Sequence, residues 1–410
     1  YSIALSADGQ TLAVGAARES SSSRGINGDQ ADNSAPRSGA VYVFRFDGAD
    51  WRQQAYIKAS NSDPYDWFGY SLALSADGNF LAVGAPYEDS VATGINGDQF
   101  DDAECGGSGA VFVFRFDGAA WGQSAYVKPS NTGGGRRDIH GLCSDGDQFG
   151  YSVAVSSSGA QIAVGAPYED SLATGIDGDQ SDAPDWMADE WDSGAVYIFV
   201  FDGASWSQQA YMKPSVSPAG YSFGRPVSLA ATGGVLAVGA FGDDSNAIGV
   251  NVPPVDIVEQ EQYEDSGSVH VFRQEAGNWA QESYIKATNP ARRDRFGLAL
   301  SLGSEGATLA VSARGEDGSS TGIGGDQNDD SSPNAGAVYV FRYSDFGWLD
   351  KAYVKAPNTD QHDWFGQSVA LGADGESLAV GGLFEASSAT GIDGDQDDNS
   401  AHGAGAVYVY

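Results

Sequence analysis

The stretch that decides the fold begins with Phe68-Gly69-Tyr70-Ser71-Leu72-Ala73-Leu74-Ser75 and continues with Phe80-Leu81-Ala82-Val83-Gly84-Ala85-Pro86. A long acidic loop follows, and then come Gly109-Ala110-Val111-Phe112-Val113-Phe114-Arg115-Phe116 and Trp121-Gly122-Gln123-Ser124-Ala125-Tyr126-Val127-Lys128. The same runs recur along the 410-residue chain, with the Phe-Gly pair beginning at Phe68, Phe149, Phe223, Phe296 and Phe365. Self-similarity at a nearly constant period indicates a repeat architecture before any single residue is considered.

Each repeat contains four short runs in which alternate residues are apolar, which is the pattern of half-buried strands. Turns such as Ala76-Asp77-Gly78 and Phe116-Asp117-Gly118 join these runs, and their glycine supplies the positive φ that a tight antiparallel hairpin needs. No helical periodicity is visible. One such sheet cannot bury both faces alone, and radial stacking of several sheets leaves only short edges. The sequence therefore predicts an all-β fold, a β-propeller of four-stranded antiparallel blades.

The Phe-Gly pairs, together with Gly84-Ala85-Pro86 and Gly165-Ala166-Pro167, resemble the FG-GAP repeat of integrin α-subunit propellers and of large secreted bacterial proteins. The resemblance covers essentially the whole chain and implies seven blades, whereas six repeats are visible and the last is incomplete. The turns between the first and second strands are too short for the Asp-x-Asp-x-Asp-Gly calcium loop of the integrin repeats. We expect one propeller over residues 1–410, with repeats at approximately 1–67, 68–148, 149–222, 223–295, 296–364 and 365–410.

The composition excludes some classes of partner. The formal net charge is −35 at pH 7, so binding to a nucleic-acid backbone is not expected. No run of about 20 apolar residues is present, so no membrane span is predicted in this segment. The two cysteines, Cys105 and Cys143, fall in loops that alternating strand direction places on one face of adjacent repeats. We predict a disulfide between them, with two unrelated buried thiols as the alternative, and an extracellular or cell-surface location.

The long loops between the second and third strands hold most of the 56 acidic residues. Five of them share the phrase Gly-Ile-x-Gly-Asp-Gln, as in Gly94-Ile95-Asn96-Gly97-Asp98-Gln99. Calcium prefers carboxylate and carbonyl oxygens, so we predict calcium as the bound ion. Asx-turns, in which the carboxylate caps the loop's own amides, and a solvated acidic coat are the alternatives. The predicted ligands are Asp29, Asp32, Asp98, Asp101, Asp179, Asp182, Asp326, Asp329, Asp395 and Asp398.

Other residues recur once per repeat. An aspartate lies two residues before the Phe-Gly pair at Asp66, Asp147, Asp294 and Asp363, and we interpret it as a turn cap, with a secondary metal role as the alternative. The fourth strand carries a lysine that we expect to snorkel or to pair locally, at Lys58, Lys128, Lys213, Lys286 and Lys355. We therefore interpret the recurring aspartates and lysines as structural rather than catalytic residues.

The fourth long loop differs from the others. It replaces the shared phrase with an apolar run that contains Val252, two prolines and Ile257. Exposed apolar surface tends to mark an interaction site, so Val252 and Ile257 are predicted to contact a partner. The alternative is that the run folds back onto its blade.

No catalytic motif is visible. The four histidines, at positions 140, 270, 362 and 402, fall at unrelated repeat positions, and neither a Gly-x-Ser-x-Gly elbow nor a His-Glu-x-x-His motif is present. We therefore predict a protein that is not an enzyme: an extracellular binding, adhesion or scaffold propeller. It would contact a protein or glycan on a cell or matrix surface, or further copies of itself, through the acidic loops. The alternative is a carbohydrate-active propeller, either a lectin or a polysaccharide lyase.

Overall fold

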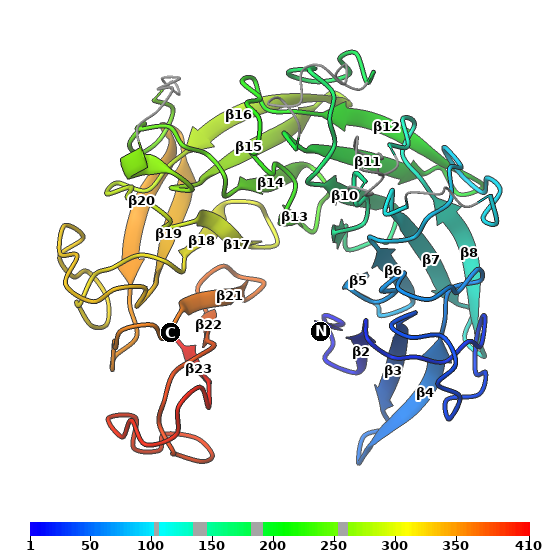
Figure 1. The fold of residues 1–410 in the computed structure, drawn as a ribbon, viewed down its shortest axis with the longest axis horizontal. Coiled ribbons are helices and arrows are strands. Elements are labelled where there is room, and N and C mark those ends of the chain that lie inside the picture. The colour runs from blue at the N-terminus through cyan, green and yellow to red at the C-terminus, as the bar shows by residue number, and fades with distance from the viewer. Residues whose placement is uncertain (102–105, 134–145, 182–191, 253–260) are drawn as a thin grey trace, which may run out of the picture. The chain divides into compact units, whose positions relative to one another are not determined.

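The structure is a computed structural model that describes residues 1–101, 106–133, 146–181, 192–252 and 261–410 (Figure 1). Regular structure in these residues consists of β-strands and one short 3-10 helix, Glu261–Tyr263. The predicted all-β fold is confirmed. No helix in this described part of the chain is long and apolar enough to cross a membrane.

The strands form six antiparallel sheets, each running in chain order, and these are the blades of a β-propeller. The prediction of four-stranded antiparallel blades with an incomplete last one is confirmed. The first three sheets contain β1 (Ser2–Leu5), β2 (Thr11–Ala16), β3 (Ala40–Phe46), β4 (Trp51–Ile57); β5 (Ser71–Leu74), β6 (Phe80–Ala85), β7 (Ala110–Phe116), β8 (Trp121–Val127); β9 (Ser152–Val155), β10 (Gln161–Ala166), β11 (Ala195–Phe201), β12 (Trp206–Met212). The last three contain β13 (Val227–Leu229), β14 (Val235–Ala240), β15 (Ser268–Glu275), β16 (Asn278–Ile285); β17 (Phe296–Leu302), β18 (Thr308–Ala313), β19 (Ala337–Ser344), β20 (Gly347–Val354); β21 (Phe365–Leu371), β22 (Leu378–Gly382), β23 (Ala406–Val409).

The recurring Phe-Gly pair joins one blade to the next. The backbone N–H of Phe68 donates to Ser38 O of the first blade at 3.1 Å, while the Phe68 ring packs against Phe112 and Phe114 of the second. The approach is so close that a Cβ on Gly39, whose φ is +83°, would lie 2.1 Å from Phe68 O. This close approach explains why glycine opens the Gly-Ala-Val run that leads into the third strand.

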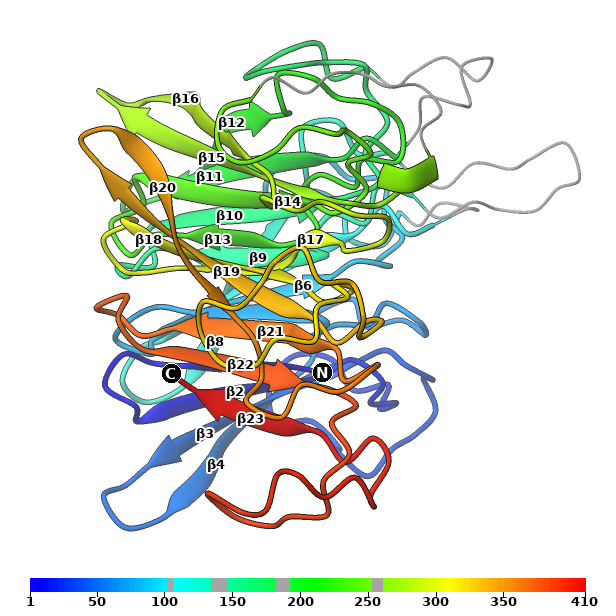
Figure 2. The same ribbon diagram turned by 90° about the vertical axis from the view of Figure 1, so that its left-hand side faces the viewer.

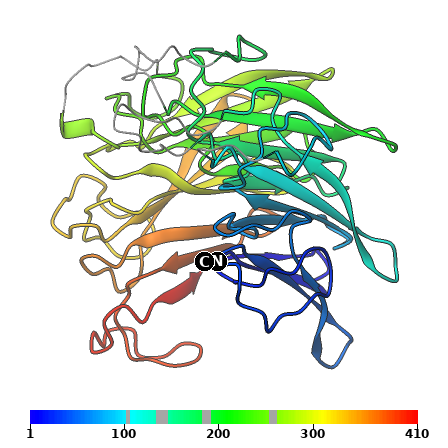
Figure 3. The same ribbon diagram turned by 45° about the vertical axis from the view of Figure 1, so that its right-hand side comes forward.

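The chain divides into two compact units, Tyr1–Leu229 and Ala230–Tyr410. In each unit the core lies between neighbouring blades: Val41 and Val43 pack with Leu81 and Val83 in the first unit. In Figure 2 β21, β22 and β23 lie side by side as one sheet of the second unit. Figure 3 shows the hairpins between third and fourth strands extending from the sheets of the first unit. The assignment of residues 1–410 to one domain stays a prediction.

Candidate functional site

Each of the first five blades buries the lysine that directly follows its fourth strand against the first acid of its long loop. In the third blade, Lys213 Nζ lies 2.7 Å from Glu169 Oε2 and donates to Ser171 O at 2.8 Å and to Ser193 Oγ at 2.6 Å. Tyr211 OH donates to the other oxygen of Glu169 at 2.9 Å. The equivalent pairs are Lys58 with Glu19, Lys128 with Glu88, Lys286 with Asp243 and Lys355 with Glu316, and each lysine side chain has no exposed surface. The lysines therefore pair locally inside the blade, as the sequence suggested.

The shared loop phrase has a local structural role. In the second blade, Ile95 forms an antiparallel bridge with Val127, and Asn96, in the left-handed conformation at φ 56°, accepts the N–H of Tyr126 at 2.9 Å. Asp98 Oδ1 then accepts the N–H of Phe100 at 3.1 Å, which is an Asx-turn. The same carboxylate-to-amide bond is made by Asp29, Asp179, Asp326 and Asp395.

The second aspartate of the phrase closes the loop. Asp32 accepts hydrogen bonds from Ser22 N at 2.7 Å and Ser22 Oγ at 2.6 Å, and these bonds lower the pKa of Asp32 to about 2. Asp329 and Asp398 bind Ser319 and Ser388 in the same way. Asp101 lies beside Val91, whose N–H donates to the Asp101 carbonyl at 2.9 Å, and Asp182 lies outside the described residues.

These bonds bear on the calcium prediction. Asp29 and Asp32, like Asp326 with Asp329 and Asp395 with Asp398, accept hydrogen bonds from the loop's own donors, which is the Asx-turn alternative. Across the described ranges, no group of three or more His, Cys, Asp or Glu side chains is arranged to hold a metal. Calcium binding by these loops stays a prediction.

The glutamine of the phrase accepts hydrogen bonds from the segment that follows the preceding blade, and this role was not predicted from the sequence. Asn61, which follows the first blade, donates from Nδ2 to Gln99 O at 2.9 Å and to Glu88 Oε1 at 2.7 Å. Ser60 Oγ donates to Gln99 Oε1. Asn131 and Asn358 make the equivalent bonds to the loops of the third and sixth blades. An asparagine recurs four residues after the end of the fourth strand in four of the five repeats that have one, at Asn61, Asn131, Asn289 and Asn358, and this recurrence is the signal that could have indicated the contact.

The fourth loop keeps more of the pattern than the sequence analysis stated. Gly249 has φ +75°, Val250 forms a bridge with Ile285, and Asn251 accepts the N–H of Tyr284 at 3.0 Å. The loop lacks the Gly-Asp-Gln of the phrase, but Gly249 to Asn251 adopt the shared conformation. Val252 is 41% exposed, so it does not fold back onto the blade. Ile257, Cys105 and Cys143 lie outside the described residues.

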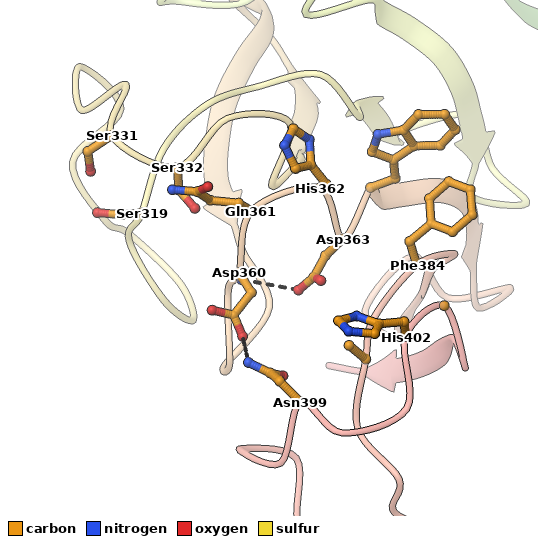
Figure 4. A pocket seen from close by; sticks show the side chains of 13 residues that line it. Ser319, Ser331, Ser332, Asp360, Gln361, His362, Asp363, Phe384, Asn399 and His402 are labelled. Carbon is orange, nitrogen blue, oxygen red and sulfur yellow. Dashed lines mark hydrogen bonds between the residues drawn. The ribbon is translucent and has the colours of Figure 1, made fainter.

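A pocket of about 890 Å³ opens in the second unit, where the loop before β21 meets the loop between β18 and β19 and the loop between β22 and β23 (Figure 4). Trp364 and Phe384 line it with ring centroids 4.7 Å apart, and the Arg314 guanidinium lies 4.2 Å above the Trp364 ring. On the polar side, Asn399 Nδ2 donates to Asp360 Oδ2 at 2.8 Å. The pocket thus combines an aromatic wall with hydrogen-bonding groups.

Asp363 lies centrally among the side chains that Figure 4 draws. Its Oδ2 accepts the N–H of Asp360 at 3.1 Å, as Asp66 and Asp294 accept an N–H three residues upstream, so the predicted turn cap is present. Burial, as the largest cause, raises the pKa of Asp363 to about 6. A carboxyl group with this pKa is partly protonated near neutral pH and can donate a proton.

Two histidines share this pocket. His362 precedes Asp363 in the chain, with φ +68°, and His402 comes from the loop before β23. The four histidines of the chain fall at unrelated repeat positions, so no pair of them was predicted from the sequence. These two share the pocket only because the loop before β21 and the loop between β22 and β23 converge on it, so no repeat signal could have found them.

The comparisons with known proteins agree with the fold. The FG-GAP repeat family model matches residues 51–114, from β4 to β7, which confirms the FG-GAP repeat β-propeller predicted from the sequence. No curated protein matches the sequence. The chain is similar to a solved structure assigned as a 6-phosphogluconolactonase from Bacteroides uniformis, with 13% identity, a TM-score of 0.35, and coverage of 90% of this chain and 95% of that one. It is also similar to the periplasmic gluconolactonase of Pseudomonas aeruginosa, with 16% identity, a TM-score of 0.40, and coverage of 83% and 71%.

These structures correct two predictions. Both carry the names of lactonases, and neither is named as an adhesion protein, so the prediction of a non-enzymatic binding, adhesion or scaffold module is not kept. The prediction that the protein is not an enzyme is corrected with it. At these identities and TM-scores the likeness concerns the fold, and neither protein's activity is transferred to this chain.

Proposed function

We propose that this protein is a carbohydrate-active propeller that binds a sugar ring in the pocket beside the sixth blade. The observation that carries the proposal is one cavity that joins Trp364 and Phe384 to Asp363, His362 and His402. A sugar ring has apolar C–H faces and a polar hydroxyl rim. Aromatic side chains match its faces, and carboxylates, amides and imidazoles match its rim.

The same side chains support acid–base chemistry on the bound sugar. Because burial raises the pKa of Asp363 to about 6, this group can protonate a departing oxygen. An imidazole is the commonest base for the opposite transfer, and His402 shares the pocket. Cleavage of a sugar-derived bond requires a proton donor and a proton acceptor that reach one ligand, and this pocket contains a candidate for each role.

The first experiment measures sugar binding. Titration calorimetry with a panel of neutral and uronate oligosaccharides should detect binding, and Trp364→Ala should weaken it about tenfold or more through lost ring contact. Phe346→Ala is the matched control, because this side chain is 90% exposed and lies outside the pocket. If no oligosaccharide in the panel binds, or if both variants lose the same affinity, the proposal is overturned.

The second experiment measures turnover. Release of reducing ends or of unsaturated sugar, followed from acid to neutral pH, should show a limb with an apparent pKa near 6 that Asp363→Asn removes. His402→Ala should lower kcat more than it raises KM, because a proton-transfer group acts in the transition state. A pH profile unchanged in Asp363→Asn would exclude this residue as the proton donor.

We also infer a location outside the cytoplasm, with calcium in the acidic loops and a Cys105–Cys143 disulfide. The support is the net charge of −35 and the five matched Gly-Ile-x-Gly-Asp-Gln loops. Mass spectrometry of an unreduced digest tests the disulfide, since two free thiols in exported protein would refute it.

A further inference from the structure

The pocket beside the sixth blade is lined by carboxylates and by no lysine or arginine. Asp360 and Asp363 are among its thirteen lining residues, and the two histidines are the only groups among these described residues that can carry a positive charge. The Arg314 guanidinium lies over the Trp364 ring and donates from Nη1 to Gln367 Oε1 at 2.7 Å, and it is not one of the lining groups. A sugar with a carboxylate or phosphate would therefore meet like charge in this pocket, and such a juxtaposition costs affinity.

Both carboxylates have an oxygen left for a ligand. Asp363 is 5% exposed, and its Oδ2 accepts the backbone N–H of Asp360, a hydrogen bond that Figure 4 draws between the two neighbouring residues. Asp360 Oδ2 accepts its hydrogen bond from Asn399 Nδ2. Within the described part of the chain, the Oδ1 atom of neither aspartate receives a hydrogen bond. A carboxylate oxygen that lines a cavity without a donor favours a ligand that supplies one.

The electrostatics of the pocket favour a small organic cation as that ligand. Burial is the largest cause that raises the pKa of Asp363. The charges of Asp360 and Glu385 raise this pKa further, and the charge of His362 lowers it. A cation bound to the free oxygens would offset the repulsion between the carboxylates and would favour the ionised form of Asp363. Across the described ranges no group of three or more His, Cys, Asp or Glu side chains is arranged to hold a metal, whereas an ammonium has three donors and can use two acceptors.

We propose that the ligand of this pocket is a sugar with a free amino group, whose ammonium donates to the Oδ1 atoms of Asp360 and Asp363. This inference rests on the proposed function, because it names the class of sugar that the same pocket takes. The C–H face of the ring lies against Trp364 and Phe384, and the ammonium lies at the carboxylate rim. An amino sugar therefore binds more tightly than a neutral sugar, and a neutral sugar binds more tightly than a uronate.

The test compares short oligomers of glucosamine, glucose and glucuronic acid that have the same linkage. Titration calorimetry at about pH 6, where an aliphatic amine is protonated, should show the glucosamine oligomer binding about tenfold more tightly than the glucose oligomer, and the glucuronic acid oligomer should bind most weakly. Asp360→Asn should remove most of the preference for the amine and should cost the glucose oligomer much less affinity. Asp345→Asn is the matched control, because it removes the same charge from an exposed position in the hairpin between β19 and β20, and the preference should persist.

Proton release gives a second readout that needs no variant. At about pH 6 roughly half of the Asp363 carboxyl groups hold a proton, so a bound ammonium should release up to about half a proton per site, measured by calorimetry in two buffers with different heats of ionisation. The glucose oligomer should release much less, and Asp363→Asn should abolish the release.

Equal affinity for the glucosamine and glucose oligomers, tighter binding of the glucuronic acid oligomer, or binding of glucosamine without proton release overturns this inference. In each of these cases a sugar still binds, so the proposed function stands. If none of the three oligomers binds, the proposed function is overturned together with this inference.

Discussion

Replacing Lys128 by methionine should destabilise the second blade strongly. Lys128 Nζ lies 3.0 Å from Glu88 Oε2, and it donates to Ser90 O at 2.8 Å and to Ser108 Oγ at 2.7 Å. Both partners of the ion pair are essentially without exposed surface. Methionine preserves most of the side-chain volume but leaves the Glu88 carboxylate buried beside Tyr126 and Asn61 without a cation.

Removing one partner of a buried ion pair costs about 3–5 kcal/mol, because the remaining charge stays desolvated. At about 1.4 kcal/mol for each factor of ten, this corresponds to roughly a hundredfold to several thousandfold more frequent opening of the blade. The double variant Lys128→Met with Glu88→Gln should recover much of this loss, since it leaves no buried charge. Burial lowers the pKa of Lys128 despite the neighbouring Glu88, which agrees with a strongly desolvated ammonium group.

Hydrogen exchange measured by mass spectrometry can follow this opening for the amides of β7 and β8. The single variant should accelerate their exchange, and the double variant should exchange more slowly than the single one. Lys351→Met changes an exposed lysine and should leave exchange unaltered. Unchanged protection in Lys128→Met, or a double variant less protected than the single one, would refute the argument from buried charge.

Three further predictions follow from other contacts. Phe112→Tyr should stabilise the protein by about 0.5–1.5 kcal/mol, because Asn61 Oδ1 is buried without a hydrogen-bond donor. In the third blade, Tyr197 occupies the position of Phe112, and its OH donates to Asn131 Oδ1 at 2.7 Å. Phe114→Tyr is the control in thermal melts and should not stabilise the protein. If the acidic loops bind calcium, a chelator should lower the melting temperature, because a ligand at a hundredfold excess over its Kd adds about 2.7 kcal/mol to the free energy of unfolding. Identical melting curves with chelator and with calcium would contradict calcium binding. The pKa of Asp363 is raised in the folded state to about 6 from an ordinary value near 4, so the folded state binds this proton more tightly than the unfolded state does. The protonated group therefore stabilises the fold at low pH, and this stabilisation is lost as the pH rises from about 4 to 6. Asp363→Asn should abolish that loss in melts compared at about pH 4.5 and 7, and an unchanged pH dependence would count against it.

Some features of this protein are readable from the chain alone. Period-2 alternation, the turn glycines and the recurring Phe-Gly pair predict the blades, because each depends on residues close in sequence or on a pattern repeated six times. Gly39 shows how local the constraint is: its positive φ and the approach of Phe68 exclude any side chain there. The loop phrase was also visible, and its five copies indicated a shared role, which we interpreted as calcium binding with Asx-turns as the alternative.

Only the tertiary structure decided what those recurring residues do. Gln99 O accepts a hydrogen bond from Asn61, which follows the preceding blade, and Lys128 forms an ion pair with Glu88. Both contacts exist because the loops bring together residues that are far apart in the chain. His362 and His402 occur once each, so repetition gives them no signal, and they share a pocket only because two loops converge on it. A repeating sequence determines the structure that repeats, whereas a site built from residues that do not repeat depends on where the folded loops place them.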